Sequence, residues 1–408
     1  MNSVGKHQLI FLWTYLEWGG AQIYSLAIMK AARADWDIVA ILPRGSAPDL
    51  LGFLNEIGVR YELIDVRLDA GPAPTISRKL QRHWRRIHSE AVSVRHLMRY
   101  DLRSAVLHLE ANPWQTWFYI TTLLVRGANV FITMHNALPR HSRWREFLWK
   151  ANMSYLALWP RFHLFTSNQD TKNKIGDWVP RSFWKNIRVT YTSINPEEIE
   201  LARELATDRN ELRDQYHIGA DSFVVLSVGQ FIDRKGRWVL LEAAKTVLQR
   251  APDVRFVWLS PTVPSPEDSV AIESYGLGDA FRLILSSSVG SKRQDILRFF
   301  SIADMFALPS FVEGLPISLL EAMAMGIPSI STAVYAIPEA IKDHETGILI
   351  EPGDADALAE RILELKNDQA LRDRLAHAGR SYVLQSFDER VAAGIAIDAY
   401  SQCLSHER

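Results

Sequence analysis

The chain has 408 residues, of which 48% are hydrophobic and 23% charged, and its single cysteine is Cys403. This composition is typical of a soluble globular protein, the length favours two domains, and one cysteine excludes an intrachain disulfide or a cysteine-rich zinc site. No apolar run approaches the roughly 20 residues that span a bilayer. The short apolar run at 9–13 indicates a first strand rather than a signal peptide, so we expect a cytoplasmic protein.

The net charge of −1 conceals a strong asymmetry between the two halves of the chain. Residues 1–195 hold 25 Lys/Arg and 14 Asp/Glu, a balance of +11, whereas residues 196–408 hold 21 and 33, a balance of −12. Eleven of the 13 tryptophans also lie in the first 195 residues. A basic, Trp-rich half suits an anionic membrane surface or an anionic acceptor.

The first half alternates apolar runs with helical patterns, which predicts parallel βαβ units and a doubly wound sheet. Helical patterns are clearest at 21–34, 113–125 and 168–176. The expected strands are 8–13, 37–42, 60–65, 104–109, 129–134, 161–166 and 187–191.

A charged stretch at 196–221 is interpreted as a linker region with a surface helix, and a second alternating series follows it. Its expected strands are 223–228, 254–259, 281–285, 304–308, 328–331 and 347–350, and its expected helices are 237–249, 291–302, 317–325, 354–366, 368–385 and 388–406. The fold class is therefore α/β, with two Rossmann-like domains facing across a cleft. We expect a first domain at 1–195, a second domain at 196–387 and a terminal helix at 388–408.

Two cations follow the first strand of the second series, in the segment from Gly229 to Gly236. Open α/β sheets bind ligands beyond the carboxyl ends of their strands, so Arg234 and Lys235 are well placed to hold a diphosphate. They would stabilise it further as it departs and gains charge. Solvated loop charges explain the same residues equally well.

The most informative segment runs from Glu313 through Gly314, Leu315, Pro316 and Ile317 to Glu321. Glu321 is the one acidic or basic side chain in residues 314–338, and a carboxylate is costly to bury without a partner. Pro316 suits a first helical position, and the N–H groups of a helix start can hold a phosphate. With a carboxylate on either side, this is a plausible cradle for a nucleotide sugar. The competing interpretation is a helix with a solvated glutamate.

Three further segments lie at or directly after the carboxyl ends of strands, where the cleft is expected. Each of them also has an ordinary structural explanation. Gly19 and Gly20 open a helix after the first strand and let a backbone approach a ligand, although a tight turn would also use them. His135 ends the fifth strand, where a lone histidine is more often structural than catalytic. The segment from Ser286 through Val289 to Gly290 is equally well a polar turn.

The spacing Glu313-x7-Glu321, with the run 303–310 before it and the run 347–354 after it, resembles the retaining nucleotide-sugar glycosyltransferases of the family-4 type, which have the GT-B fold. The resemblance is clear over 222–390 and weaker before 195. It implies that Lys235 binds diphosphate, that a glycine loop reaches the donor, that His135 contacts the donor sugar, and that the segment at Val289 contacts the base. It also implies an acceptor-side domain at 1–195 and a nucleotide-sugar-binding domain at 196–387, with a terminal helix that packs back on the first domain. The reaction it implies is metal-independent and uses no cofactor.

The chain departs from that family at three places. Gln230 stands where the family often has an arginine directly after the first glycine, and Arg234 is the candidate substitute. Tyr335 and Ala336 replace a Gly-Gly pair, and the segment 191–195 replaces the usual Asn-Gly turn.

Residues 78–103 predict a basic amphipathic helix, with eight Lys/Arg, three His and two acids. A second cluster of basic and aromatic side chains lies at 140–150. Contact with a membrane or a lipid-linked acceptor, and a core-packed helix with a solvated basic face, explain these segments equally well. No nucleic-acid-binding motif accompanies them.

The sequence therefore predicts a retaining hexosyltransferase that uses a nucleotide-sugar donor and a glycan or lipid-linked acceptor, with peripheral membrane contact as an option. Glu313, Lys235 and His135 are the expected catalytic residues, with Glu321 on the ribose. The alternatives are a catalytically inactive scaffold that binds nucleotide sugars, or a sugar epimerase on the same fold. No metal-site motif is present.

Overall fold

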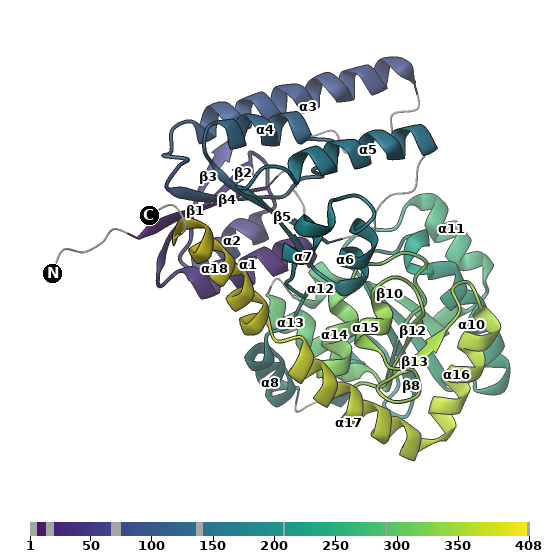
Figure 1. Cartoon of the computed structure of the whole chain (residues 1–408). Coiled ribbons are helices and arrows are strands. Elements are labelled where there is room, and N and C mark those ends of the chain that lie inside the picture. Colours follow the sequence, from purple (N-terminus) through teal and green to yellow (C-terminus); the bar gives the residue numbers. More distant parts are fainter. Residues whose placement is uncertain are drawn as a thin grey trace. The chain divides into compact units, whose positions relative to one another are not determined.

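A computed structural model of the chain describes residues 6–13, 20–66, 75–135, 142–206, 209–290 and 292–405. The contacts divide it into two compact units, one of residues 1–191 with 390–408 and one of residues 192–389 (Figure 1). The expected boundaries at 195 and 387 lie within a few residues of these divisions. Among the described residues, no helix combines the length and apolar character needed to cross a membrane.

The first unit is built on a parallel sheet in the order β3-β2-β1-β4-β5-β6-β7. Its strands are β1 His7–Leu12, β2 Trp36–Pro43, β3 Arg60–Ile64, β4 Ala105–Leu109, β5 Asn129–Met134, β6 Phe162–Thr166 and β7 Arg188–Val189. Its helices are α1 Gly20–Ala32, α2 Pro48–Glu56, α3 Ile76–Leu97, α4 Trp117–Val125, α5 Arg143–Leu156, α6 Gln169–Ile175, α7 Arg181–Asn186 and α18 Glu389–Ser405. The strand order reverses between β1 and β4, and a ligand crevice is expected at such a switch point.

Both faces of this sheet are buried, which explains why its strands are continuous apolar runs. Ile10 and Leu12 belong to the core beneath α3, α4 and α5, whereas Leu9 and Phe11 belong to the core that includes residues of α1, α2 and α18. Tyr400 on α18 is fully buried in the second of these cores. The terminal helix therefore forms part of the first unit.

The second unit has a parallel sheet in the order β10-β9-β8-β11-β12-β13. Its strands are β8 Phe223–Val228, β9 Val254–Ser260, β10 Phe281–Leu285, β11 Met305–Leu308, β12 Ser329–Thr332 and β13 Ile348–Ile350. Its α-helices are α8 Pro196–Leu205, α9 Arg209–Gln215, α10 Arg237–Arg250, α11 Pro266–Ser274, α12 Ser286–Val289, α13 Arg293–Phe299, α14 Ile317–Ala324, α15 Ile337–Ala340, α16 Ala355–Asn367 and α17 Gln369–Ser386. Short 3₁₀ turns are η1 Asp233–Lys235, η2 Gly278–Ala280 and η3 Phe300–Ile302. Here the order reverses between β8 and β11.

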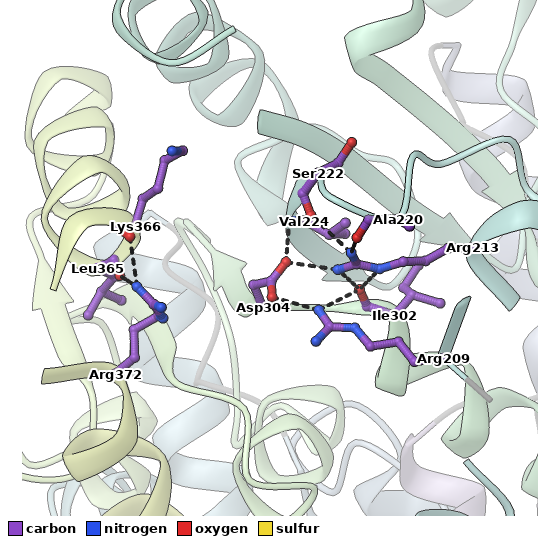
Figure 2. A network of polar contacts seen from close by, with 10 residues as sticks. All are labelled: Arg209, Arg213, Ala220, Ser222, Val224, Ile302, Asp304, Leu365, Lys366 and Arg372. Atoms are coloured by element: carbon purple, nitrogen blue, oxygen red, sulfur yellow. Dashed lines mark hydrogen bonds and ion pairs between the residues drawn. The ribbon is translucent and has the colours of Figure 1, made fainter. Parts of the chain in front are cut away.

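The segment 196–221 is not a linker, because α8 and α9 pack into the second unit. The Arg213 side chain on α9 is 3% exposed and its Nη2 lies 2.8 Å from Asp304 Oδ2. The same carboxylate oxygen accepts a hydrogen bond from the Val224 backbone at the start of β8 (Figure 2). Arg209 binds the other oxygen of Asp304 at 2.6 Å. A residue that precedes β11 thus fastens α9 to the sheet.

Candidate active site

Two loops meet at the switch point of the second unit, one after β8 and one after β11. Gly236 ends the first loop with φ of +73°, a left-handed conformation that side chains disfavour. A Cβ at Gly236 would lie 1.9 Å from the carbonyl oxygen of Pro309 in the second loop. Glycine is therefore needed for both conformation and space. The close approach brings the preceding cations against the second loop.

Lys235 and Glu313 form a buried ion pair between these loops. Lys235 Nζ lies 2.5 Å from Glu313 Oε1, with the side chains 11% and 6% exposed. The hydroxyl of Ser310 donates a hydrogen bond to the same oxygen at 3.0 Å. Arg234 Nη1 lies 3.6 Å from the other oxygen of Glu313, and its side chain is half exposed. One carboxylate therefore holds two cations at the edge of the sheet, and Arg234 extends into solvent.

The helix α14 begins directly behind this pair. Pro316 is its N-cap, with Ile317 as the first helical residue, so the proline stands one position earlier than the sequence predicts. Ser318 donates a hydrogen bond to the carbonyl of Val228 and fixes the helix start against the end of β8. The first N–H groups of a helix lack intrahelical acceptors and suit an anion. Gly314, Leu315, Pro316 and Ile317 thus follow Glu313 into a helix start beside Lys235.

Glu321 is buried in α14, and its partner is an arginine that sequence reasoning missed. Arg293 Nη2 lies 2.6 Å from Glu321 Oε1, and Arg293 Nε lies 2.9 Å from Glu198 Oε2 on α8. Burial raises the pKa of Glu321, and the guanidinium of Arg293 opposes that shift. Arg293 bridges two carboxylates from separate helices. Its only sequence signal was a cation at the start of the predicted helix 291–302.

Val289 and Gln230 complete the predicted residues of the second unit. Val289 is half-buried and ends the single-turn helix α12, so the expected polar turn is one turn of helix just before α13. Gln230 is also half-buried, and its carbonyl accepts a hydrogen bond from the Ile232 backbone.

The first unit places His135 beside a buried glutamate at its own switch point. His135 Nε2 lies 3.5 Å from Oε1 of Glu110, which directly follows β4 and is 4% exposed. Ser25 on α1 donates a hydrogen bond to the same oxygen at 3.2 Å. Burial raises the pKa of Glu110, but His135, His108 and Ser25 outweigh it and hold that pKa below its usual range. Sequence reasoning missed Glu110, although an acid directly after an apolar strand was a usable signal.

The glycine pair is described only in part. Gly20 is the first residue of α1, whereas Gly19 lies outside the described residues, as does Asn136 after His135. His135 also packs edge-on against the ring of Tyr24 on α1, with centroids 5.0 Å apart. Gly20 and His135 thus belong to helix and strand ends of the first unit.

A buried chain of hydrogen bonds connects the terminal helix α18 with this region. His108 Nδ1 lies 2.5 Å from the Tyr400 hydroxyl, and His108 Nε2 lies 2.9 Å from Thr133 Oγ1. Thr133 donates to the Tyr24 hydroxyl at 3.3 Å, and Tyr24 lies 2.5 Å from Thr190 Oγ1. Burial lowers the pKa of His108 to about 4. A neutral His108 with its proton on Nε2 satisfies every contact of the chain.

Metal ligands are not grouped in the described residues: no cluster of three or more His, Cys, Asp or Glu side chains is found there. The charges gathered at the switch point of the second unit are instead those of Lys235, Arg234 and Glu313.

Residues 208–382 match the family model of group 1 glycosyl transferases, a span that contains Arg234, Lys235, Glu313 and Glu321. The capsular polysaccharide biosynthesis glycosyltransferase CapM of Staphylococcus aureus is 25% identical over 59% of this chain and 61% of its own length. The amylovoran biosynthesis glycosyltransferase AmsK of Erwinia amylovora is 32% identical over 51% of this chain and 49% of its own. The chain thus spans about two fifths to three fifths of the length of the curated relatives it matches.

Solved structures show the fold over nearly the whole chain. Anabaena HepE in complex with UDP and glucose has a TM-score of 0.76 at 18% identity, covering 97% of this chain and 99% of its own. A glycosyltransferase from Rickettsia africae also has a TM-score of 0.76, at 15% identity, covering 98% and 99%. The protein has the GT-B fold of two Rossmann-like domains. Together with the family match, this supports a GT-B glycosyltransferase.

Proposed function

We propose that the protein transfers a hexose from a nucleotide sugar to a glycan or lipid-linked acceptor, with retention of the anomeric configuration. The observation that carries the proposal is the Lys235–Glu313 pair, buried at the switch point of the second unit and next to the start of α14. A lone ion pair here would be an ordinary structural feature. A half-exposed second cation and a helix N-terminus beside it make a site for a diphosphate and a sugar.

Each residue has a defined part in this proposal. Lys235 and Arg234 bind the diphosphate and stabilise it as it departs, because its charge grows as the bond to the sugar breaks. Glu313 accepts hydrogen bonds from the sugar hydroxyls, and the backbone N–H groups of Gly314, Leu315 and Ile317 bind sugar and phosphate oxygens. The leaving phosphate takes the acceptor proton in a front-face attack.

The remaining roles follow the resemblance. Glu321 binds the ribose, the segment at Val289 contacts the base, His135 orients the donor sugar, and Gly19 and Gly20 bring backbone close to the donor. The chain's own cations supply the positive charge, and no metal or cofactor takes part.

The names of similar proteins support the donor and acceptor classes of this proposal. HepE has been solved with UDP and with UDP-glucose, so UDP-sugars are the first donors to test. CapM and AmsK are named for polysaccharide biosynthesis, which supports a glycan precursor as acceptor. In this proposal, the protein is located on the cytoplasmic side of a membrane, where such a precursor is made.

The test is calorimetric titration with UDP, UDP-glucose and the matching GDP, ADP and dTDP sugars, with Mg²⁺ and with a chelator. We expect one nucleotide to bind equally in both conditions, and product analysis by NMR to show the donor's anomeric configuration. Glu313→Ala should lose transfer and keep nucleotide binding. Lys245→Ala, on the exposed side of α10 in the same unit, is the matched control. An inverted product, or transfer that requires the metal, would overturn the mechanism.

Gln230 motivates the alternative of an inactive binding subunit, since it stands where a cation is expected. That alternative predicts donor binding without turnover, and Gln230→Arg would then restore measurable hydrolysis of the donor. An epimerase on the same fold would release an altered nucleotide sugar without any acceptor.

A further inference from the structure

The helix α3 carries an apolar stripe that its own unit does not cover. Ile76, Leu80 and Trp84 follow one another at intervals of four residues, so they lie on one side of the helix. They are 77%, 56% and 68% exposed. Burial in α3 is confined to its last turns, at Ser93 and Leu97. Packing within the described part of this unit therefore does not explain the exposed stripe.

The same part of α3 is strongly basic. Residues 76–89 contain no acidic residue, and the first acid, Glu90, lies 3.7 Å from Arg86. The cations of this stretch are Arg78, Lys79, Arg82, Arg85 and Arg86. Thr75 accepts a hydrogen bond from the Arg78 backbone and caps the helix, so the stripe and the cations are held by a properly started helix.

The helix α5 repeats this combination. Trp144, Phe147 and Leu148 are 70%, 60% and 44% exposed, and Leu158 beyond the helix end is 73% exposed. Spacings of three and four residues from Trp144 place Phe147 and Leu148 along one side of the helix with it. Trp144 and Phe147 stack with their ring centroids 5.7 Å apart. Arg143, Arg145 and Lys150 are the cations of α5.

The helix α4 connects the two, since it packs against both α3 and α5 (Figure 1). Its Phe118 is 69% exposed, and its Trp117 contacts Tyr155 of α5 with centroids 5.8 Å apart. Exposed aromatic side chains thus lie on three neighbouring helices, and the cations lie on α3 and α5. All three helices come from the half of the chain with a balance of +11. We call this surface the α3–α5 face.

We propose that the α3–α5 face binds the surface of an anionic lipid bilayer, with α3 lying along it. Aromatic and aliphatic side chains enter the boundary between headgroups and acyl chains, while the cations meet the anionic headgroups. The apolar stripe supplies the buried area and the cations supply selectivity for negative lipid.

Two other occupants fit the face less well. A second copy of the chain in a two-fold dimer would bring five cations of one α3 against the same five of the other, and residues 76–89 contain no acid to offset them. A nucleic acid would meet the cations, but it leaves the aliphatic stripe of Ile76 and Leu80 unused. Only a bilayer uses both the stripe and the charges.

The test is sedimentation of the full-length protein with vesicles of phosphatidylcholine alone and of equal parts phosphatidylcholine and phosphatidylglycerol. We expect binding to the mixed vesicles, little binding to the neutral ones, and release at high salt. Leu80→Ser with Trp84→Ser should weaken binding at least tenfold. Val270→Ser, at an apolar position of α11 that is 68% exposed, is the matched control and should bind as the wild type does.

A second double variant distinguishes the contribution of charge to binding from that of apolar burial. Arg78→Gln with Lys79→Gln removes two cations and should weaken binding to mixed vesicles about thirtyfold, while binding to neutral vesicles stays weak. Failure of the wild type to sediment, or equal sedimentation of the stripe variant, would overturn the proposal. So would a wild-type dimer in analytical ultracentrifugation that the stripe variant converts to monomer, because the face would then join two copies.

This surface is independent of the proposed transfer reaction. Circular dichroism melts of every variant show whether the first unit, which contains α3, is still folded, and nucleotide titration tests the second unit separately. A protein that binds vesicles and no nucleotide would refute the function proposed above and leave the α3–α5 face standing, and the reverse result would do the opposite.

Discussion

Replacement of Lys235 by methionine tests whether the buried pair at the switch point has both a structural and a chemical role. The change removes the ammonium group that lies 2.5 Å from Glu313 and keeps most of the apolar length of the side chain. Among the described residues, the partners left to the buried Glu313 are then the Ser310 hydroxyl and the more distant Arg234. Breaking a buried pair in this way costs about 3–5 kcal/mol.

Thermal unfolding measures the structural part of this prediction. In a unit of about 200 residues each kcal/mol shifts Tm by about 2–4 °C, so Lys235→Met should lower Tm by roughly 6–20 °C. The double variant Lys235→Met, Glu313→Gln removes both charges and should recover at least half of that loss. The amide oxygen of the substituted side chain would still accept the hydrogen bond from Ser310.

The same two variants distinguish the effect of Lys235 on catalysis from its effect on stability. Loss of charge stabilisation of the departing diphosphate should lower kcat about 10²–10³-fold in Lys235→Met. The double variant regains stability without activity. A stable single variant would show that the ion pair does not form in solution, and transfer by the double variant would refute the assigned roles.

Three further predictions rest on individual contacts. Gly236→Ala should unfold the second unit or lower its Tm severely, because the new Cβ would lie 1.9 Å from the carbonyl oxygen of Pro309. The control in circular dichroism melts is Gly276→Ala, since Gly276 also has a left-handed backbone but has open space around it. Tyr400→Phe should lower stability by about 1–3 kcal/mol, since His108 Nδ1 loses its buried partner, whereas the exposed Ser401→Ala should change little in denaturant unfolding. His108, with its pKa lowered to about 4, stays neutral in the fold and protonates more readily when unfolded, so its contribution is complete above pH 6.5 and is lost as the pH falls towards 4. The resulting loss of unfolding free energy is about 2 kcal/mol between pH 7.5 and pH 5. His108→Gln should remove this loss, so stability measured by urea unfolding should change less over that pH range. An unchanged slope of stability against pH would contradict the assignment.

Strand positions were predictable because both sheets are parallel and buried on both faces. The runs 129–134 and 223–228 are strands β5 and β8 with the same bounds, since continuous apolar residues leave little choice of structure. Helices without a buried side are harder to predict. The helix α11 has no buried residue, so its sequence lacks a periodic apolar pattern. The helix α5 does bury Trp149, Met153 and Leu156, but its exposed aromatic side chains obscure that spacing, and it was seen only as a cluster of basic and aromatic residues.

The site was predictable where its residues share one segment and was missed where it depends on packing. The run from Glu313 to Glu321 identifies one side of the site by itself. Arg293 could not be assigned, because its partners Glu321 and Glu198 come from two other helices that only the fold brings together. Glu110 was missed for the same reason, since its contacts with His135 and Ser25 join β4, β5 and α1.

Because Arg293 contacts both Glu321 and Glu198, the pKa of Glu321 depends on two residues from other helices. Arg293 opposes the rise that burial produces in the pKa of Glu321, whereas the neighbouring charge of Glu198 adds to that rise. Arg293→Met should therefore favour protonated Glu321 and weaken donor binding. Glu198→Gln removes the carboxylate that shares Arg293 with Glu321, so it should favour the ionised form of Glu321.

The two variants predict opposite changes in the pH dependence of the donor dissociation constant. For a ribose held by ionised Glu321, binding is complete above the pKa of Glu321 and is lost as the pH falls through it. Arg293→Met moves this loss to higher pH, and Glu198→Gln moves it to lower pH. Calorimetric titration from pH 8 to pH 5 measures both, with Tm recorded to exclude unfolding. If both variants shift the loss in the same direction, or neither shifts it, then Glu321 is a structural anchor between α8, α13 and α14 and does not bind the ribose.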